Sequence, residues 1–376
     1  MQPALESPAG APVEIPERSV SWSGLAFPLG LGLLSHLVVY LTVYLTATAG
    51  VRDASGQRLH PAWRLLARWD GGWYERIALH GYEYAPDRLQ HSVAFFPLFP
   101  LLVRPLAKLG VPFGLAGAIV NGLAFLGALG LLYVWARALG GERMARWATA
   151  ALALCPMAIF GSVAYTEGLF LLLTLASLFA AWRGKFGLAA LSGILATASR
   201  LPGIALIPAL LIEAIRQRRG WRGLALACAP ALGTLAYFAW LWRRFGDPLA
   251  YLHAEHAWQR SVGIDVAGFI HLLIYGMVSE GMLPAVLVFG GVYLAWRYRD
   301  RLPAGALTYT AASFAILFLS GFAASAARYV YGIGPLALAA GWWLTERPRW
   351  AWALVIYSAI LLAVLARTFA LGLWVA

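Results

Sequence analysis

The sequence predicts an all-α integral membrane protein with about 11 transmembrane helices, within a range of about 9–12. Three observations lead to this fold class. Of the 376 residues, 61% are hydrophobic and only 12% are charged, and the mean hydropathy is +0.70. A soluble domain carries about 25% charged residues, which cover its surface. Long apolar runs also follow one another, and about 20 such residues cross a bilayer as a helix. The composition excludes a water-soluble globule and a disordered chain.

The apolar runs divide the chain in order. Residues 1–24 carry Pro, Gly and acidic residues without an apolar core, which predicts a flexible cytoplasmic tail. Residues 25–376 are predicted to form a single integral-membrane domain. The expected spans lie near residues 25–50, 113–136, 147–163, 167–182, 187–199, 201–215, 223–242, 271–296, 304–324, 329–345 and 350–370.

Arginine placement predicts the topology. The formal net charge is +12, and Lys108 and Lys185 are the only lysines. Cytoplasmic loops collect positive charge, and no basic block stands apart from the apolar runs, so the charge favours membrane orientation over nucleic-acid binding. A cytoplasmic N-terminus places the basic loops inside, at residues 137–146, 183–185, 216–222, 297–301 and 347–349. Arg243 and Arg244 do not fit this rule.

This topology requires a broken helix between residues 187 and 215, because that stretch must enter and leave on the same side. Arg200-Leu201-Pro202-Gly203 lies in its middle. Proline removes a backbone donor and glycine favours turns, so the stretch is predicted to form two short helices. Freed backbone at membrane depth must be covered by protein or water. A polar cavity is therefore expected near Arg200.

Two long loops then fall on the extracytoplasmic side, at residues 51–112 and 243–270. The first holds more than a quarter of the charged residues and is expected to carry interfacial helices. Connections between helices usually take about 2–8 residues, and longer ones tend to be functional. Any chemistry is therefore expected on the outer face.

The densest polar and aromatic motif in the first loop is RWDGGWYERIALHGY, which contains Trp69, Asp70, Trp73 and Tyr74. Its apolar spacing predicts a helix over residues 73–80. Asp70 sits where an N-cap would stand. Alternatively, Asp70 is a general base, since desolvation beside aromatic rings raises the pKa of a carboxylate. The rings would then offer faces on which a sugar can stack.

Two further segments carry polar candidates. His91 opens a stretch rich in proline and phenylalanine that ends at Arg104 and is expected to lie against the bilayer. Glu167 follows Tyr165-Thr166 at the mouth of two spans. Ionisable groups at such depth are costly and tend to face a cavity. Glu167 is therefore either a site residue or the structural partner of an arginine.

Histidines and arginines supply candidate ligands for an anion. His253 and His256 lie close together, but no third ligand has zinc spacing. Arginine binds phosphate oxygens through paired hydrogen bonds, so a lipid phosphate is the favoured ligand. The alternative for each arginine is a salt bridge, for example with Glu167 or Glu280. The candidate donor-binding residues are Arg200, His256, Arg260, Arg328 and Tyr329.

These motifs resemble the PIG-V-type mannosyltransferases, the family of GPI mannosyltransferase 2 and its bacterial relatives. The resemblance covers about residues 25–340. It is carried by the strings RWDGGWYERIALHGY, AFFPLFPLLVR, YTEGLFLLL, SRLPG, GDPLAYLHAEHAWQR and ARYVYGIGPL.

The resemblance implies the GT-C glycosyltransferase fold, with its active site on the outer face. It also implies a mannose donor linked to polyprenyl phosphate and inversion at the anomeric carbon. By position, Asp70 matches the first-loop acid expected to be the catalytic base, and Glu167 matches the second acidic position. Arg200, His256 and Arg328 fall in the strings that surround the donor.

The sequence therefore predicts a polyprenyl-phosphate-mannose-dependent glycosyltransferase of a bacterial cytoplasmic membrane, acting on an extracytoplasmic glycan, glycolipid or protein. No cofactor is expected, and the motifs do not indicate a divalent metal. Membrane lipid is an expected partner and nucleic acid is not. The alternative is a carrier of lipids or small anions, which would place polar residues along several spans. The residues expected to bind the acceptor or sugar are Trp69, Trp73, Tyr74, His91 and Glu167.

Overall fold

The computed structural model describes residues 22–49, 52, 56, 61–258, 263, 266–275, 282–320 and 325–375. Every element named within these ranges is a helix, which confirms the all-α prediction. The predicted flexible tail at residues 1–24 lies almost entirely outside the described residues. The division into this tail and one membrane domain stays a prediction.

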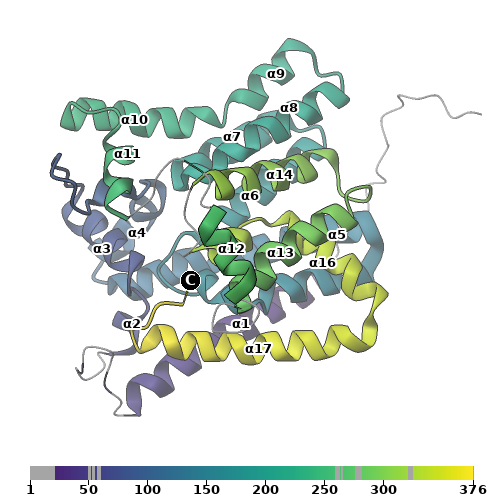
Figure 1. Cartoon of the computed structure of the whole chain (residues 1–376), viewed down its shortest axis with the longest axis horizontal. Coiled ribbons are helices and arrows are strands. Elements are labelled where there is room, and N and C mark those ends of the chain that lie inside the picture. The colour runs from purple at the N-terminus through teal and green to yellow at the C-terminus, as the bar shows by residue number, and fades with distance from the viewer. Residues whose placement is uncertain are drawn as a thin grey trace, which may run out of the picture.

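Within the described residues, three helices are long and apolar enough to cross a membrane: α1 (Trp22–Thr48), α5 (Phe113–Ala153) and α17 (Pro348–Ala370). A fourth span arises if α9 (Gly220–Cys228) and α10 (Ala231–Phe245), which meet at 45°, are counted as one. In Figure 1, α9 and α10 lie along one edge of the molecule and α17 lies along the opposite edge. The predicted count of about 11 spans is not confirmed.

The other apolar runs form shorter helices because glycine and proline interrupt them. Gly141, with φ of 78°, divides α5 between the runs at 113–136 and 147–163, and the second run is helical only to Ala153 before the 3-10 helix η2 (Pro156–Gly161). The run at 329–345 is divided at Gly332–Gly334. The shorter helices in this part of the chain are α6 (Glu167–Trp182), α12 (Val266–Tyr275), α13 (Met282–Arg297), α14 (Ala304–Leu319), α15 (Ala326–Tyr331) and α16 (Pro335–Glu346).

The predicted break between residues 187 and 215 is confirmed. Helix α7 (Phe186–Ser199) ends before Arg200, which has extended backbone. The short 3-10 helix η3 (Leu201–Ala205) follows, and α8 (Leu206–Arg216) continues from it. Pro202 stands at the start of η3, where its missing N–H has no helical partner to lose. Arg200 therefore leaves the helical backbone at the centre of the stretch.

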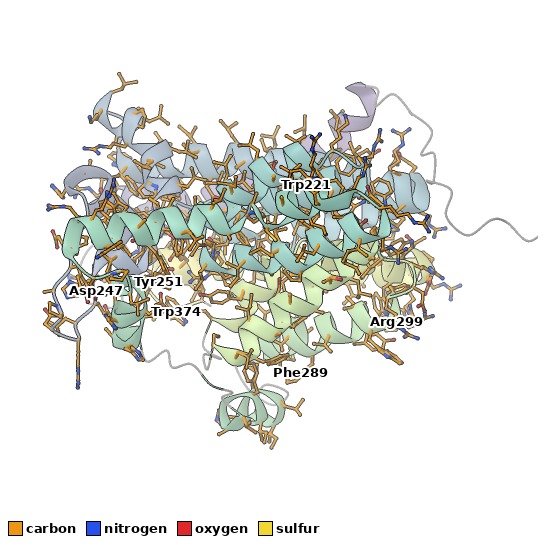
Figure 2. All side chains as sticks on the ribbon, turned by 90° about the horizontal axis from the view of Figure 1, so that it is seen from above. Trp221, Asp247, Tyr251, Phe289, Arg299 and Trp374 are labelled. Atoms are coloured by element: carbon orange, nitrogen blue, oxygen red, sulfur yellow. The ribbon has the colours of Figure 1, made fainter. Side chains whose placement is uncertain are left out.

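The two loops predicted to lie on the outer side contain short helices. The first loop forms α2 (Ala62–Leu65), α3 (Asp70–His80), the 3-10 helix η1 (Ser92–Ala94) and α4 (Leu98–Lys108). The second forms α11 (Ala250–Glu255) and η4 (His256–Trp258) before α12. Figure 2 shows Asp247 and Tyr251 at one end of the molecule and Arg299 at the other. The predicted topology requires this separation between an outer loop and a basic cytoplasmic loop.

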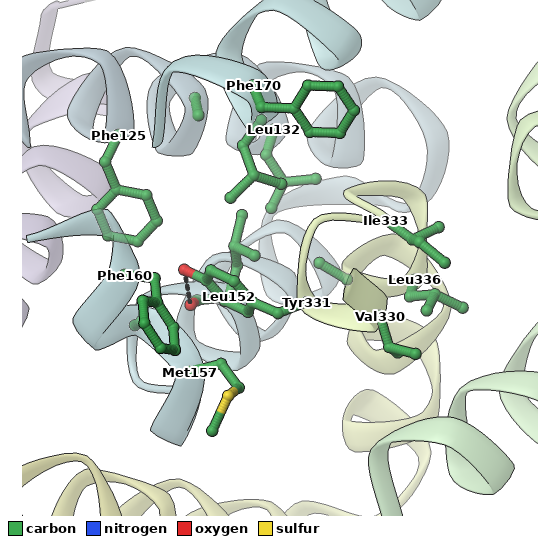
Figure 3. Close-up of a cluster of buried hydrophobic side chains, with 14 of the residues drawn as sticks. Phe125, Leu132, Leu152, Met157, Phe160, Phe170, Val330, Tyr331, Ile333 and Leu336 are labelled. Atoms are coloured by element: carbon green, nitrogen blue, oxygen red, sulfur yellow. Dashed lines mark hydrogen bonds between the residues drawn. The ribbon is translucent and has the colours of Figure 1, made fainter. Parts of the chain in front are cut away.

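The core surrounds α5, which packs against α1, α6 and α16. Buried side chains of these segments and of α15 meet near Phe125, Leu152 and Tyr331 (Figure 3). Helix α6 begins directly beside α5, since a Cβ on Gly168 would lie 2.4 Å from the Asn121 carbonyl oxygen. Small residues permit this close approach between helices. The approach carries Glu167 into the interior.

Candidate active site

A polar cavity of about 380 Å³ opens between α3, the start of α6, η3 and α15. It contains most of the residues that the sequence singles out. Five aromatic residues of the first loop line it, together with three acids and two arginines. The predicted residues in its lining are Trp69, Asp70, Trp73, Tyr74, Glu167, Arg200, Arg328 and Tyr329. The cavity expected near Arg200 is thereby confirmed.

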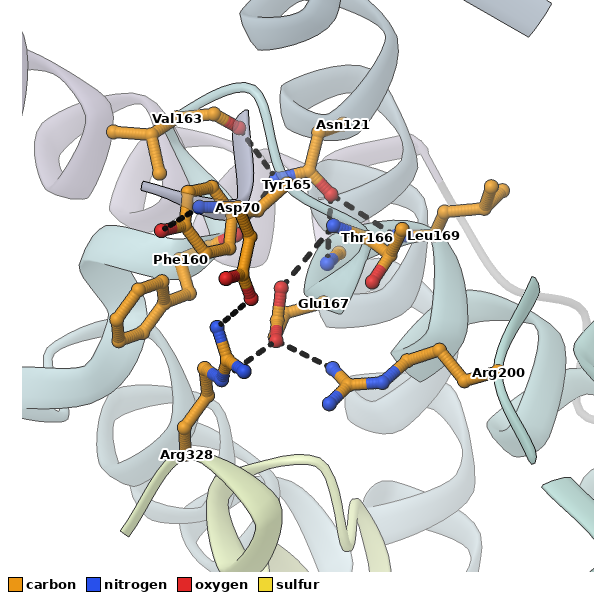
Figure 4. Close-up of polar contacts among 11 residues, drawn as sticks. Asp70, Asn121, Phe160, Val163, Tyr165, Thr166, Glu167, Leu169, Arg200 and Arg328 are labelled. Carbon is orange, nitrogen blue, oxygen red and sulfur yellow. Dashed lines mark hydrogen bonds and ion pairs between the residues drawn. The ribbon is translucent and has the colours of Figure 1, made fainter. Parts of the chain in front are cut away.

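Four charged side chains form a chain across this cavity (Figure 4). Arg328 Nη1 donates to Asp70 Oδ2 at 2.6 Å, and Arg328 Nε lies 3.5 Å from Glu167 Oε1. Arg200 Nη1 donates to the same Glu167 oxygen. Two carboxylates thus balance two guanidiniums, which buried charges require. The Glu167 side chain is 1% exposed, whereas that of Asp70 is 21% exposed and reaches the open part of the cavity.

Asp70 is not an N-cap, so that prediction is wrong. It is the first residue of α3, no side-chain hydrogen bond caps this helix, and its carboxylate faces Arg328 instead. The Asp70 backbone N–H donates to the Tyr165 hydroxyl at 3.2 Å. The preceding residue, Trp69, has φ of 56°, which is strained for a bulky side chain. Strain of this kind concentrates at functional sites.

Asn121 positions Glu167, and the sequence analysis missed it. Its Oδ1 accepts from the backbone N–H groups of Gly168 and Leu169 at 2.8 and 3.3 Å, which satisfies donors at the start of α6. Its Nδ2 donates to the carbonyls of Phe160 and Val163 at 2.7 and 2.9 Å. The sequence did contain a sign of this role, since Asn121 is an amide side chain within the apolar run at residues 113–136.

Replacing Asn121 by leucine is expected to lower the free energy of unfolding by about 2–5 kcal/mol, because four buried backbone groups lose their partners. Transfer activity should fall with it, since the start of α6 carries Glu167. Thr149→Val is the matched control in the same helix, because its buried hydroxyl bonds only to Ala145 one turn earlier. Thermal unfolding in detergent measures both variants. Equal midpoints for the two would contradict this role of Asn121.

Aromatic rings surround both arginines. Arg200 lies 5.2 Å from the Tyr329 ring centre, and Arg328 lies 5.4 and 5.6 Å from those of Phe160 and Tyr165. Such contacts stabilise a guanidinium that is removed from water. Burial also raises the pKa of Tyr74, so its phenol stays protonated at neutral pH. The cavity thus combines fixed charges with neutral aromatic walls.

An apolar cavity of about 490 Å³ adjoins the polar one. Arg200, Arg328 and Tyr329 line both, and so does Glu255, so two guanidiniums and one carboxylate stand at the boundary between the two. The remaining wall is mostly aliphatic and aromatic and includes Phe170, Ile204, Tyr309, Ile316, Leu317 and Ile333. A ligand that joins a charged group to an apolar chain matches this boundary.

His91 lies outside the cluster around Asp70. It pairs with Asp87 at 2.6 Å and lines a third cavity, of about 520 Å³, with His253 and His256. The hydrogen bond from His91 lowers the pKa of Asp87. His256 also lines the apolar cavity. Arg260 lies outside the described residues, and within the described part of the chain no group of three or more metal-ligating side chains comes together.

Part of the chain that forms this site matches a known protein family. Residues 46–216 match the mannosyltransferase (PIG-V) family. The resemblance to PIG-V mannosyltransferases is confirmed. The PIG-V match includes Asp70, Asn121, Glu167 and Arg200, whereas Arg328 lies beyond it.

Curated PIG-V relatives are longer proteins. The chain is 29% identical over 244 residues to GPI mannosyltransferase 2 of Drosophila pseudoobscura pseudoobscura. This match covers 57% of this chain and 51% of the relative. It is 34% identical over 157 residues to GPI alpha-1,6-mannosyltransferase 2 of Cricetulus griseus, and this match covers 39% of this chain and 31% of the relative. The chain therefore spans about half or less of the length of these relatives.

Among solved structures, the fold is similar to that of ArnT from Cupriavidus metallidurans bound to undecaprenyl phosphate, with a TM-score of 0.56 and 19% identity. The similarity covers 87% of this chain and 62% of that one. Identity this low shows the fold alone, which is similar to that of ArnT. Together with the apolar helices, it supports an integral membrane protein.

Proposed function

We propose that this chain transfers mannose, or a similar hexose, from a polyprenyl-phosphate donor to an acceptor hydroxyl at the outer face of a bacterial cytoplasmic membrane. One observation carries the proposal: Asp70 lines a polar cavity, and the guanidiniums of Arg200 and Arg328 lie where that cavity joins an apolar one. A lipid-linked sugar has the matching order of groups, with a phosphate between an apolar chain and a sugar. The PIG-V match supports mannose as the sugar.

In this proposal the apolar cavity receives the first part of the lipid, and the phosphate lies against Arg200 and Arg328. Within the described residues, Arg328 Nε lies 3.5 Å from Glu167 Oε1 but donates no hydrogen bond, so in this proposal it donates to a phosphate oxygen. Tyr329 holds the plane of Arg200, which favours paired hydrogen bonds to phosphate. His256, which lines the apolar cavity, also belongs to this donor side.

Asp70 then acts as the general base of a single displacement. The acceptor oxygen forms a bond to the anomeric carbon while its proton passes to the Asp70 carboxylate. The bond from the anomeric carbon to the phosphate oxygen breaks, and its electron pair leaves with the phosphate. The guanidiniums stabilise the added negative charge. Attack opposite the leaving phosphate inverts the anomeric carbon. The phosphate also competes with Asp70 for Arg328, which frees the carboxylate for this role.

Vesicles containing the purified chain and polyprenyl-phosphate mannose with a radiolabel in the sugar test the proposal. We expect the label to move to an added glycoside acceptor, with one polyprenyl phosphate released for each glycosidic bond. The rival carrier function would move the intact donor across the bilayer without breaking this bond. Translocation without product would therefore overturn the proposal.

Arg200→Lys is expected to raise the donor KM by about tenfold, because lysine keeps the charge but loses the planar contact with Tyr329 and the paired donors. The matched control is Arg146→Lys, at a predicted cytoplasmic loop. Arg146 also combines an ion pair, with Glu142 at 2.7 Å, and a ring contact, with Phe27 at 5.5 Å. Initial rates at varied donor concentration measure both. An equal change in the two variants would remove Arg200 from the donor site.

A further inference from the structure

Trp374 lines the polar cavity although it comes from the segment that follows the last helix. Helix α17 ends at Ala370, and Gly372 has φ of 79°, where glycine is favoured. A Cβ on Gly372 would lie 2.6 Å from Arg68 Nη1. The Leu373 N–H donates back to the Thr368 carbonyl at 3.1 Å. This turn at glycine directs the chain back from α17 towards the first outer loop.

Trp374 meets Trp69 at the cavity. The ring centres are 5.3 Å apart and the planes stand at 83°. The two residues are 45% and 44% exposed, so neither ring is covered by the core. Both line the same cavity as Asp70. Two perpendicular, partly exposed rings beside a carboxylate fit the apolar C–H face of a pyranose, while its hydroxyls remain in the polar space.

The position of the pair distinguishes acceptor from donor. The apolar cavity shares Arg200, Arg328 and Tyr329 with the polar one, but Trp69, Asp70 and Trp374 are absent from its lining. A donor held by its lipid and phosphate enters from the arginine side. The tryptophans lie on the Asp70 side, where the hydroxyl that loses its proton must bind.

We infer that Trp374 and Trp69 form a stacking site for a pyranose ring of the acceptor. The acceptor is then a carbohydrate, rather than a protein hydroxyl or a simple lipid alcohol. This inference rests on the proposed function, since it takes Asp70 as the base that receives the acceptor proton. Trp374 is a specificity-determining residue of the acceptor site.

The test uses the full chain in vesicles, with polyprenyl-phosphate mannose as donor and methyl mannoside as the acceptor probe. Trp374→Ala should raise the KM for methyl mannoside by about tenfold and leave the donor KM unchanged. Trp374→Phe keeps an aromatic face and should recover most of the loss. Trp352→Ala is the matched control on the neighbouring helix, because Trp352 is 64% exposed and packs edge-to-face on Trp147 at 5.1 Å.

Three outcomes would overturn the inference: a changed donor KM in Trp374→Ala, an equal loss in Trp374→Ala and Trp374→Phe, or a serine peptide accepted as efficiently as methyl mannoside. Binding of labelled methyl mannoside without donor separates this inference from the proposed function. Binding that Trp374→Ala weakens supports the stacking site even if no transfer occurs. Transfer with unchanged binding in Trp374→Ala would refute the stacking site and leave the proposed function standing.

Discussion

Asp70→Asn is expected to lower the rate of mannose transfer by about 10²–10⁴-fold, the usual contribution of a general base. The amide has nearly the shape of the carboxylate and still accepts a hydrogen bond from Arg328, so the chain should fold and bind donor. It cannot take the acceptor proton. The loss should therefore appear in kcat, with little change in the donor KM, when initial rates are measured in vesicles.

The matched control is Asp87→Asn in the same outer loop. The Asp87 side chain is 40% exposed, and its carboxylate pairs with His91 in the third cavity. This variant should keep near-wild-type transfer. Near-full activity in Asp70→Asn would eliminate Asp70 as the base, whatever the result at Asp87.

Arg328→Met should affect both stability and activity. The Arg328 side chain is 6% exposed and is paired with Asp70 and Glu167. Its removal leaves two carboxylates close together without this cation, and breaking a buried pair costs about 3–5 kcal/mol. Transfer should also be lost, because a guanidinium that faces the leaving phosphate disappears. Thermal unfolding and initial rates measure the two effects.

Arg328→Lys separates charge from geometry. Lysine restores the positive charge, so much of the stability should return, but a single ammonium cannot reproduce the planar fork of donors. Transfer should remain below the wild-type rate. Arg301→Met is a control at the opposite end of the fold, where Arg301 is half exposed and pairs with Glu346 at 3.0 Å. Its loss should cost about 0–1 kcal/mol. If Arg328→Met lost no more stability than Arg301→Met, the ion pairs of Arg328 with Asp70 and Glu167 would not stabilise the fold as described.

The residues of the site were largely predictable because charge is scarce in this chain. An ionisable side chain among apolar spans is costly unless it is paired or faces a cavity. That argument found Glu167 and Arg200, and turn chemistry found the break after Ser199. It also left open whether Glu167 is a site residue or a partner of an arginine. Glu167 pairs with two arginines and lines the cavity as well.

The pairing itself was not predictable. Asp70 and Arg328 are 258 residues apart, and only the packing of α5, α6 and α15 brings them together. Trp374 was missed because a single tryptophan after an apolar run is also typical of a membrane interface. The N-cap prediction at Asp70 was wrong because a tertiary ion pair outweighed the local capping pattern. The apolar run at 147–163 does not stay helical because Pro156 begins a 3-10 helix within it.

The most direct test of the central claim is the anomeric configuration of the product, read by NMR from a polyprenyl-phosphate mannose of known configuration. One base and one displacement predict an inverted linkage in every product molecule. Retention requires two displacements through a covalent glycosyl intermediate. One carboxylate would then be the nucleophile that forms this intermediate, and a second would act on the acceptor. A product with inverted configuration would support Asp70 as the base of a single displacement. A product with retained configuration would contradict it.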